Sequence, residues 1–196
     1  MSTVNEQELN EIVHQVLARL PQGGSTQPST TPAVTPLKSA PSPKNTVAIG
    51  ADHGGFPLKE ALKPTLTELG YSVIDCGTSS TSAVDYPDFA QVVAELVSSG
   101  RAWRGIMIDG AGIGSCMTAN KVPGVRASMC YDLSTASNAR EHNDANLLTL
   151  GAGLIGEALA KQILKTWLST EFGGGRHAKR VEKIMAVEKQ YLKDGK

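Results

Sequence analysis

The segment GIMIDGAGIGS, residues 105–115, joins a short apolar run to three closely spaced glycines. The apolar run is typical of a strand that is buried on both faces, and it ends at Asp109. Gly110, Gly112 and Gly114 then allow the backbone to turn tightly into a following helix. The segment therefore predicts a strand–turn–helix unit with an acidic side chain at the turn.

The sequence of this turn is compatible with two roles. N–H groups around Ser115, at the start of a helix expected over about 113–121, could hold a phosphate or an enediolate oxygen. Alternatively, the glycines only permit the geometry of the turn. The glycines alternate strictly, unlike G-x-G-x-x-G, and the P-loop lysine is absent, so we do not expect a mononucleotide site.

Further apolar runs surround this segment and alternate with helical patterns. The runs are TVAIG (46–50), YSVIDCG (71–77), VRASMC (125–130) and NLLTLG (146–151). Helical patterns cover about 57–69, 87–99, 154–168 and 177–192. This alternation predicts an α/β fold, a three-layer sandwich in which helices cover both faces of a five-stranded parallel sheet.

Polar side chains gather next to the predicted strands. They are Asp52 and His53 after the first strand, Asp85 and Tyr86 after the second, Asp109 at the end of the third, and His142 and Asn143 in the helix before the fifth. Ligands of parallel α/β folds bind at the carboxyl edge of the sheet. We therefore expect these side chains to form an active site at that edge.

Two arginines near the C-terminus form a candidate phosphate clamp. In GGGRHAKR, residues 173–180, Arg176 and Arg180 are four residues apart and share one face of the predicted helix. Two guanidinium groups that follow a flexible glycine run can hold a phosphate between them. The alternative is a solvated basic face, but the glycine run favours the clamp.

Composition narrows the classes of function. The chain has 196 residues with 19 Lys plus Arg and 19 Asp plus Glu, and this balance argues against a nucleic-acid-binding protein. No apolar run is long enough to cross a membrane. The three cysteines form no disulfide framework, which fits a cytoplasmic protein. No residues have metal-ligand spacing, so we expect no metal site.

The chain divides into three parts. Residues 21–45 contain six of the ten prolines, together with many Ser and Thr residues, and are predicted to be a flexible linker. The folded domain is expected over 46–196. Residues 1–20 are predicted to include a short amphipathic helix whose apolar stripe consists of Leu9, Ile12, Val13, Val16, Leu17 and Leu20.

The predicted N-terminal helix needs a docking surface, because a lone helix of this length is marginal in water. It could fold back onto its own domain or stay disordered, but the long linker favours an external partner. A short amphipathic helix on a Pro/Ser/Thr-rich linker resembles the encapsulation peptides of bacterial microcompartment enzymes. That resemblance implies that residues 4–20 dock on a shell protein.

The folded domain resembles the ribose-5-phosphate isomerase B family, which includes the galactose-6-phosphate isomerase subunits. The matching stretches are GADHGGFPLK (50–59), DYPDFA (85–90), GAGIGSCMTANKVPGVRA (110–127), EHNDANLLTLGAGLIG (141–156) and GGRHAKRVEKI (174–184). The resemblance implies a Rossmann-like sheet and a homodimer or dimer of dimers with shared active sites. It also implies aldose–ketose isomerisation of a phosphorylated sugar, of the ribose 5-phosphate/ribulose 5-phosphate type, without metal or cofactor.

The resemblance also implies roles for individual residues. His53, Arg176 and Arg180 would bind the phosphate, and His142 would open the sugar ring from the neighbouring subunit. Asp52, Tyr86 and Asn143 would contact sugar hydroxyls, and the backbone from Gly110 through Gly112 and Gly114 to Ser115 would stabilise the enediolate. A histidine suits ring opening because it titrates near neutrality.

The chain departs from the family pattern at the catalytic base. Many members have Cys where this chain has Asp109, and others have Glu where it has Ser115. Asp109 is therefore the candidate base, a role that a carboxylate fills in triosephosphate isomerase. Ala111 and Gly153 replace a hydroxyl residue and an arginine of the family, which suggests a changed substrate. A degenerate binding or partner subunit with little activity is the alternative.

Overall fold

The computed structural model describes residues 45–192 of the chain. The predicted N-terminal helix (1–20) and nearly all of the predicted linker (21–45) lie outside the described residues, so both stay predictions.

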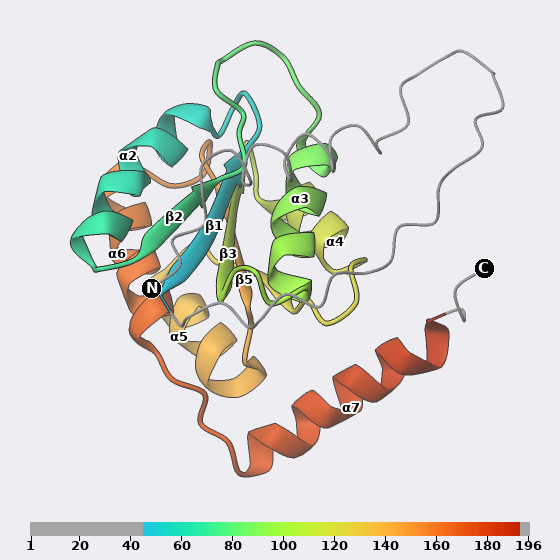
Figure 1. The fold of residues 1–196 in the computed structure, drawn as a ribbon. Coiled ribbons are helices and arrows are strands. Elements are labelled where there is room, and N and C mark those ends of the chain that lie inside the picture. The colour runs from blue at the N-terminus through green and yellow to red at the C-terminus, as the bar shows by residue number, and fades with distance from the viewer. Residues whose placement is uncertain (1–44, 193–196) are drawn as a thin grey trace, which may run out of the picture.

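The centre of the domain is one parallel sheet (Figure 1). Its strands are β1 (Thr46–Ala51), β2 (Ser72–Asp75), β3 (Arg104–Asp109), β4 (Ala127–Met129) and β5 (Leu147–Gly151). They lie in the order β2-β1-β3-β5-β4, and every pair of neighbours is parallel. The predicted five-stranded parallel sheet is confirmed, with each strand within two residues of its expected range.

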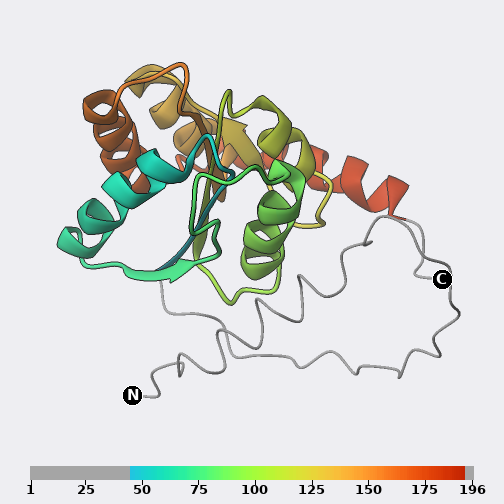
Figure 2. The same ribbon diagram turned by 90° about the horizontal axis from the view of Figure 1, so that it is seen from above.

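Helices cover both faces of the sheet. They are α2 (Phe56–Glu68), α3 (Tyr86–Ser98), α4 (Ile113–Ala119), α5 (Leu133–Asn143), α6 (Glu157–Ser169) and α7 (Arg176–Tyr191). Helices α2, α5 and α6 pack on one face and α3 and α4 on the other, while α7 extends away from the sheet (Figures 1 and 2). The predicted three-layer sandwich is therefore confirmed.

Each face of the sheet has its own apolar core. On one face, Leu62 and Leu66 of α2 pack with Trp167 of α6, all fully buried. On the other face, Val92 and Val93 of α3 lie against the sheet. Burial of each such aliphatic side chain contributes about 1.5–3 kcal/mol, so the two layers fix the strands between them.

The parallel strands give the sheet two chemically different edges. Strands β1, β2 and β3 end near one another at the carboxyl edge, and the chain reverses its winding direction between β1 and β3. Helix α5 runs in the opposite direction to the strands, so its last residues lie at the amino edge. The start of α7 lies there too, because the Gly173 N–H donates to the Glu141 carbonyl oxygen at 2.9 Å.

Within residues 45–192, no helix has both the length and the apolar character needed to cross a membrane.

Gly55 lets α2 begin directly against β3, and it provides a test of this packing. A Cβ at Gly55 would lie 2.2 Å from the Ile108 carbonyl oxygen, whereas a Cβ at Gly54 meets nothing closer than 3.4 Å. Gly55→Ala should therefore lower the free energy of unfolding by about 1–3 kcal/mol in urea denaturation, while Gly54→Ala should cost less than about 1 kcal/mol. Equal midpoints and slopes for the two variants would contradict this packing.

Candidate active site

The buried carboxylate of Asp109 lies at the centre of the carboxyl edge. It is 4% exposed and follows directly from β3. It accepts hydrogen bonds from the N–H groups of Ala111 at 2.8 Å, Gly112, and Ser115 at 3.1 Å, and from the Ser115 hydroxyl. Together these donors form a cradle, and the Asp109 carboxylate itself occupies it.

The shape of this cradle depends on the glycines of the turn. Gly112 has a φ of 78°, a conformation that L side chains rarely adopt, and its carbonyl oxygen accepts a hydrogen bond from the Thr149 hydroxyl at 2.8 Å. The turn therefore places several N–H groups where an anion can lie. The glycine geometry of the turn is thus observed, while its binding of a substrate oxygen stays a prediction.

The other predicted residues of the carboxyl edge surround Asp109. Asp52 is buried, and its carboxylate accepts the Gly55 N–H at 2.8 Å. The exposed ring of His53 lies with Nδ1 3.2 Å from the Val84 carbonyl oxygen. The Tyr86 ring crosses Gly114, where a Cβ would lie only 2.4 Å from it. The structure thus brings Asp52, His53, Tyr86 and the 109–115 segment to one edge.

His142 and Asn143 lie at the opposite edge of the sheet, so the expectation that they join the carboxyl-edge residues of the same chain is wrong. They end α5, which precedes β5, and a helix that precedes a parallel strand delivers its last residues to the start of that strand. Arg176 and Arg180, at the start of α7, belong to this second group.

The second group is built around two stacked histidines. The rings of His142 and His177 are 4.2 Å apart and nearly parallel, at 5°. Arg176 Nε lies 3.4 Å from His177 Nε2. Burial lowers the pKa of His177 below its usual value of 6.5, and its electrostatic interactions with His142, Arg176 and Arg180 lower it further. This edge therefore favours the neutral form of His177.

Positive charge exceeds negative charge beside this group. Asp144 alone pairs with three guanidinium groups, those of Arg140 at 2.7 Å, Arg126 at 3.0 Å and Arg104 at 3.9 Å. Burial, followed by the charge of Arg140, lowers the pKa of Arg104 to about 10. Sequence reasoning missed this cluster, because its arginines belong to three separate segments and no spacing connects them.

The two groups of candidate residues are separated by the length of a strand. Strands β1 and β3 have six residues each, and at about 3.3 Å per residue the two edges lie roughly 17–20 Å apart. One sugar phosphate does not span that distance. In a single copy of the chain the candidate residues therefore form two separate groups, one at each edge of the sheet.

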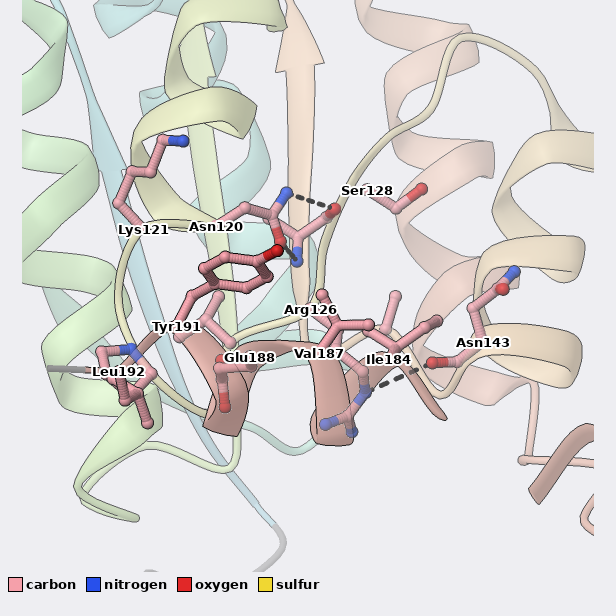
Figure 3. A pocket seen from close by; sticks show the side chains of 14 residues that line it. Asn120, Lys121, Arg126, Ser128, Asn143, Ile184, Val187, Glu188, Tyr191 and Leu192 are labelled. Carbon is pink, nitrogen blue, oxygen red and sulfur yellow. Dashed lines mark hydrogen bonds between the residues drawn. The ribbon is translucent and has the colours of Figure 1, made fainter. Parts of the chain in front are cut away.

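A groove of about 630 Å³ runs between α7 and the segment that leads into β4 (Figure 3). The side chains of Ile184, Val187 and Tyr191 line it from α7, and Asn143 lies at its rim. These three α7 side chains are 47%, 56% and 75% exposed. The groove thus has an apolar wall from α7, lies next to the amino-edge group of candidate residues and does not include the Asp109 cradle.

No group of three or more His, Cys, Asp or Glu side chains within residues 45–192 could hold a metal ion.

Comparison with known proteins assigns the family. The family model described as ribose/galactose isomerase matches residues 47–184. The chain belongs to the ribose/galactose isomerase family. Ribose-5-phosphate isomerase B of Escherichia coli is 44% identical over 144 residues, which cover 74% of this chain and 97% of that protein. D-erythrulose-4-phosphate isomerase of Pectobacterium atrosepticum is 43% identical over 145 residues, which cover 74% and 95%.

Solved structures of the ribose/galactose isomerase family share the fold. Ribose-5-phosphate isomerase B of Clostridium thermocellum is 52% identical, with a TM-score of 0.73 over 74% of this chain and 99% of that one. The Mycoplasma genitalium enzyme, solved with bound ribulose 5-phosphate, is 37% identical, with a TM-score of 0.72 over 74% and 97%. The chain is accordingly a sugar-phosphate aldose–ketose isomerase.

His177 gives the domain a pH-dependent stability. Its folded-state pKa lies below the unfolded value of 6.5, so between these two values the unfolded chain binds more protons. The free energy of unfolding should therefore fall as the pH drops below about 6.5. His177→Phe keeps a ring against His142 without a titrating group. Urea denaturation between pH 5 and pH 7.5 should show a weaker pH dependence for this variant, and an unchanged dependence would contradict the assignment.

Proposed function

We propose that the chain interconverts ribose 5-phosphate and ribulose 5-phosphate through an enediolate intermediate. The relatives named ribose-5-phosphate isomerase B support this substrate. A four-carbon sugar phosphate is the second candidate, because the D-erythrulose-4-phosphate isomerase is almost equally similar. The observation that carries the proposal is the Asp109 cradle, which holds a potential base and oxyanion donors at one place.

In this proposal Asp109 is the base. Its carboxylate takes the proton from the carbon next to the carbonyl group, so the C–H bond breaks, an O–H bond forms on Asp109, and the electron pair moves to the carbonyl oxygen. Protonation removes the negative charge of Asp109, and the N–H groups of Ala111, Gly112 and Ser115 can then donate to the enediolate oxygen. The hydroxyl proton on the carbon that lost its hydrogen then moves to the enediolate oxygen, and a new carbonyl group forms at that carbon. Asp109 returns its proton to the former carbonyl carbon, which completes the isomerisation.

The remaining candidate residues would bind the substrate and prepare it. His53, Arg176 and Arg180 would hold the phosphate, His142 would open the sugar ring, and Asp52, Tyr86 and Asn143 would contact hydroxyl groups. The surplus of guanidinium groups around Asp144 supports phosphate binding near Arg176 and Arg180, because it raises the positive potential of the amino edge.

The separation of the two groups of candidate residues leads to the proposal that two copies share each active site. A two-fold pair would place the carboxyl edge of one copy against the amino edge of the other, twice, and so complete two sites. The exposed apolar side chains of α7 along the groove of Figure 3 would contribute buried surface to this pair. A homodimer or a dimer of such dimers satisfies this arrangement.

For residues 4–20 we propose docking on a microcompartment shell protein, which would place this cytoplasmic enzyme inside the compartment. The support is their amphipathic pattern and the Pro/Ser/Thr-rich segment that follows it. Deletion of residues 1–20 should abolish co-purification with the shell and leave kcat and KM unchanged. Retained co-purification would contradict the proposal, and so would a loss of activity.

The substrate proposal is tested by turnover on a panel of four-, five- and six-carbon sugar phosphates. We expect kcat/KM to be highest for ribose 5-phosphate or, for the second candidate, for the four-carbon substrate. Tight binding without turnover of any member would instead support the degenerate-subunit alternative.

Mixed dimers test the shared site. Asp109→Asn removes the base at the carboxyl edge, and the pair Arg176→Ala and Arg180→Ala removes the clamp at the amino edge, so each variant alone should lose at least about 100-fold in kcat/KM. Unfolding and refolding an equal mixture should restore about a quarter of the wild-type activity, since half of the dimers then contain one intact site. His53→Ala can replace Asp109→Asn if that variant does not fold. A mixture no more active than its components would contradict the shared site.

A further inference from the structure

Lys59, outside the candidate active site, is the most deeply buried charged side chain of α2. Its side chain is 1% exposed, although an ammonium group is costly to remove from water. Its Nζ lies 2.5 Å from Asp75 Oδ1 and donates to the Thr78 carbonyl oxygen at 2.8 Å. Lys59 therefore connects α2 both to the end of β2 and to the segment that follows it.

The ion pair with Asp75 does not by itself explain why the Lys59 ammonium group is buried, because Asp75 also has other hydrogen-bond donors. Asp75 also accepts hydrogen bonds from Lys63 Nζ at 2.7 Å and from the Gly77 N–H at 3.0 Å. Burial alone would raise the pKa of Asp75, but the hydrogen bonds from Lys59, Lys63 and Gly77 outweigh it and leave the pKa below its usual value. Without Lys59, Asp75 would keep two of these partners.

The contact that distinguishes Lys59 from Lys63 is the one with Thr78. Residues 77 and 78 are joined to the end of β1, because the Ala51 N–H donates to the Gly77 carbonyl oxygen at 2.7 Å and the Thr78 N–H donates to the Ala51 carbonyl oxygen at 2.8 Å. The bond from Lys59 fixes this segment from the side of α2.

The segment fixed in this way begins the loop 79–85, which arches over the carboxyl edge in green at the top of Figure 1. At its far end, Val84 holds the His53 ring through contacts of 3.2 and 3.3 Å to Nδ1. The loop then leads into α3, whose first residue is Tyr86. Two candidate substrate-binding side chains thus depend on where this loop lies.

We propose that Lys59 is a positioning residue for substrate binding: by holding the Thr78 carbonyl, it fixes the loop 79–85 and so aligns His53 and Tyr86 with the sugar phosphate. This inference rests on the proposed function for the roles of His53 and Tyr86. Lys59 makes no contact with the substrate in this account.

The proposal separates binding from chemistry. The Asp109 cradle belongs to β3, the turn that follows it and α4. Its N–H donors, from Ala111, Gly112 and Ser115, are hydrogen-bonded to Asp109 and not to Lys59 or the loop. The Tyr86 ring lies against Gly114, which is not one of these donors. Loss of the Thr78 contact should therefore weaken binding and leave the proton-transfer machinery in place, which raises KM more than it lowers kcat.

The test compares Lys59→Met with Lys63→Met in the full chain. Both substitutions remove an ammonium group from Asp75, but only the first removes the donor to Thr78. We expect Lys59→Met to raise KM at least about threefold and to keep kcat within about threefold, while Lys63→Met keeps both within about twofold. Hydrogen exchange of the 78–86 amides should accelerate in Lys59→Met alone. If Lys59→Met does not fold, Lys59→Gln takes its place with the same expectation, because a shorter neutral amide cannot reach both partners.

The proposal is overturned if the folded Lys59 variant raises KM less than threefold, if its kcat falls more than its KM rises, or if Lys63→Met raises KM equally. Calorimetric binding of ribitol 5-phosphate, which has no carbonyl group to isomerise, separates this failure from failure of the proposed function. A wild-type chain that binds this probe without turning over ribose 5-phosphate contradicts the proposed reaction. A Kd that stays within threefold of wild type in the Lys59 variant contradicts the positioning role.

Discussion

All five strands of the sheet run in the same direction, and the positions of both groups of candidate residues follow from this. The shared direction gives the sheet one edge where strands end and another where they begin, separated by the length of a strand. Asp109 and its cradle lie at the first edge because they follow β3. The stacked histidines and the arginines of α7 lie at the second because α5 ends and α7 begins there. The proposal that both sets serve one active site therefore includes two copies of the chain.

The cradle shows how a turn that needs glycine can also organise charge. Its N–H groups are fixed by backbone hydrogen bonds before any substrate binds, so they need little reorganisation during a reaction. In the free protein they stabilise the Asp109 carboxylate, which occupies the place expected for an oxyanion. A base and an oxyanion that use the same donors cannot both carry full negative charge there, and transfer of one proton between them removes the conflict.

The fold was largely predictable from the sequence, and the site was predictable in part. Continuous apolar runs such as GIMID define buried parallel strands, because few other arrangements bury every side chain of a short segment. The residues around Asp109 were expected at one edge because they follow strands whose carboxyl ends meet there. His142 was misplaced because a rule about strand ends was applied to a helix that precedes a strand. The pairing of Asp144 with Arg104 and Arg126 and the contact between Lys59 and Thr78 join residues far apart in the chain, and no local pattern records them.

We propose that this chain isomerises a sugar phosphate by proton transfer at the Asp109 cradle. The most direct measurement is the reaction of ribose 5-phosphate in D₂O, with the ketose product observed by NMR. If Asp109 exchanges its proton with solvent while the enediolate is bound, at least part of the ketose product should carry deuterium at C1. Folded Asp109→Asn should lose both turnover and labelling. Conversion without any deuterium, or full labelling by Asp109→Asn, would contradict the account.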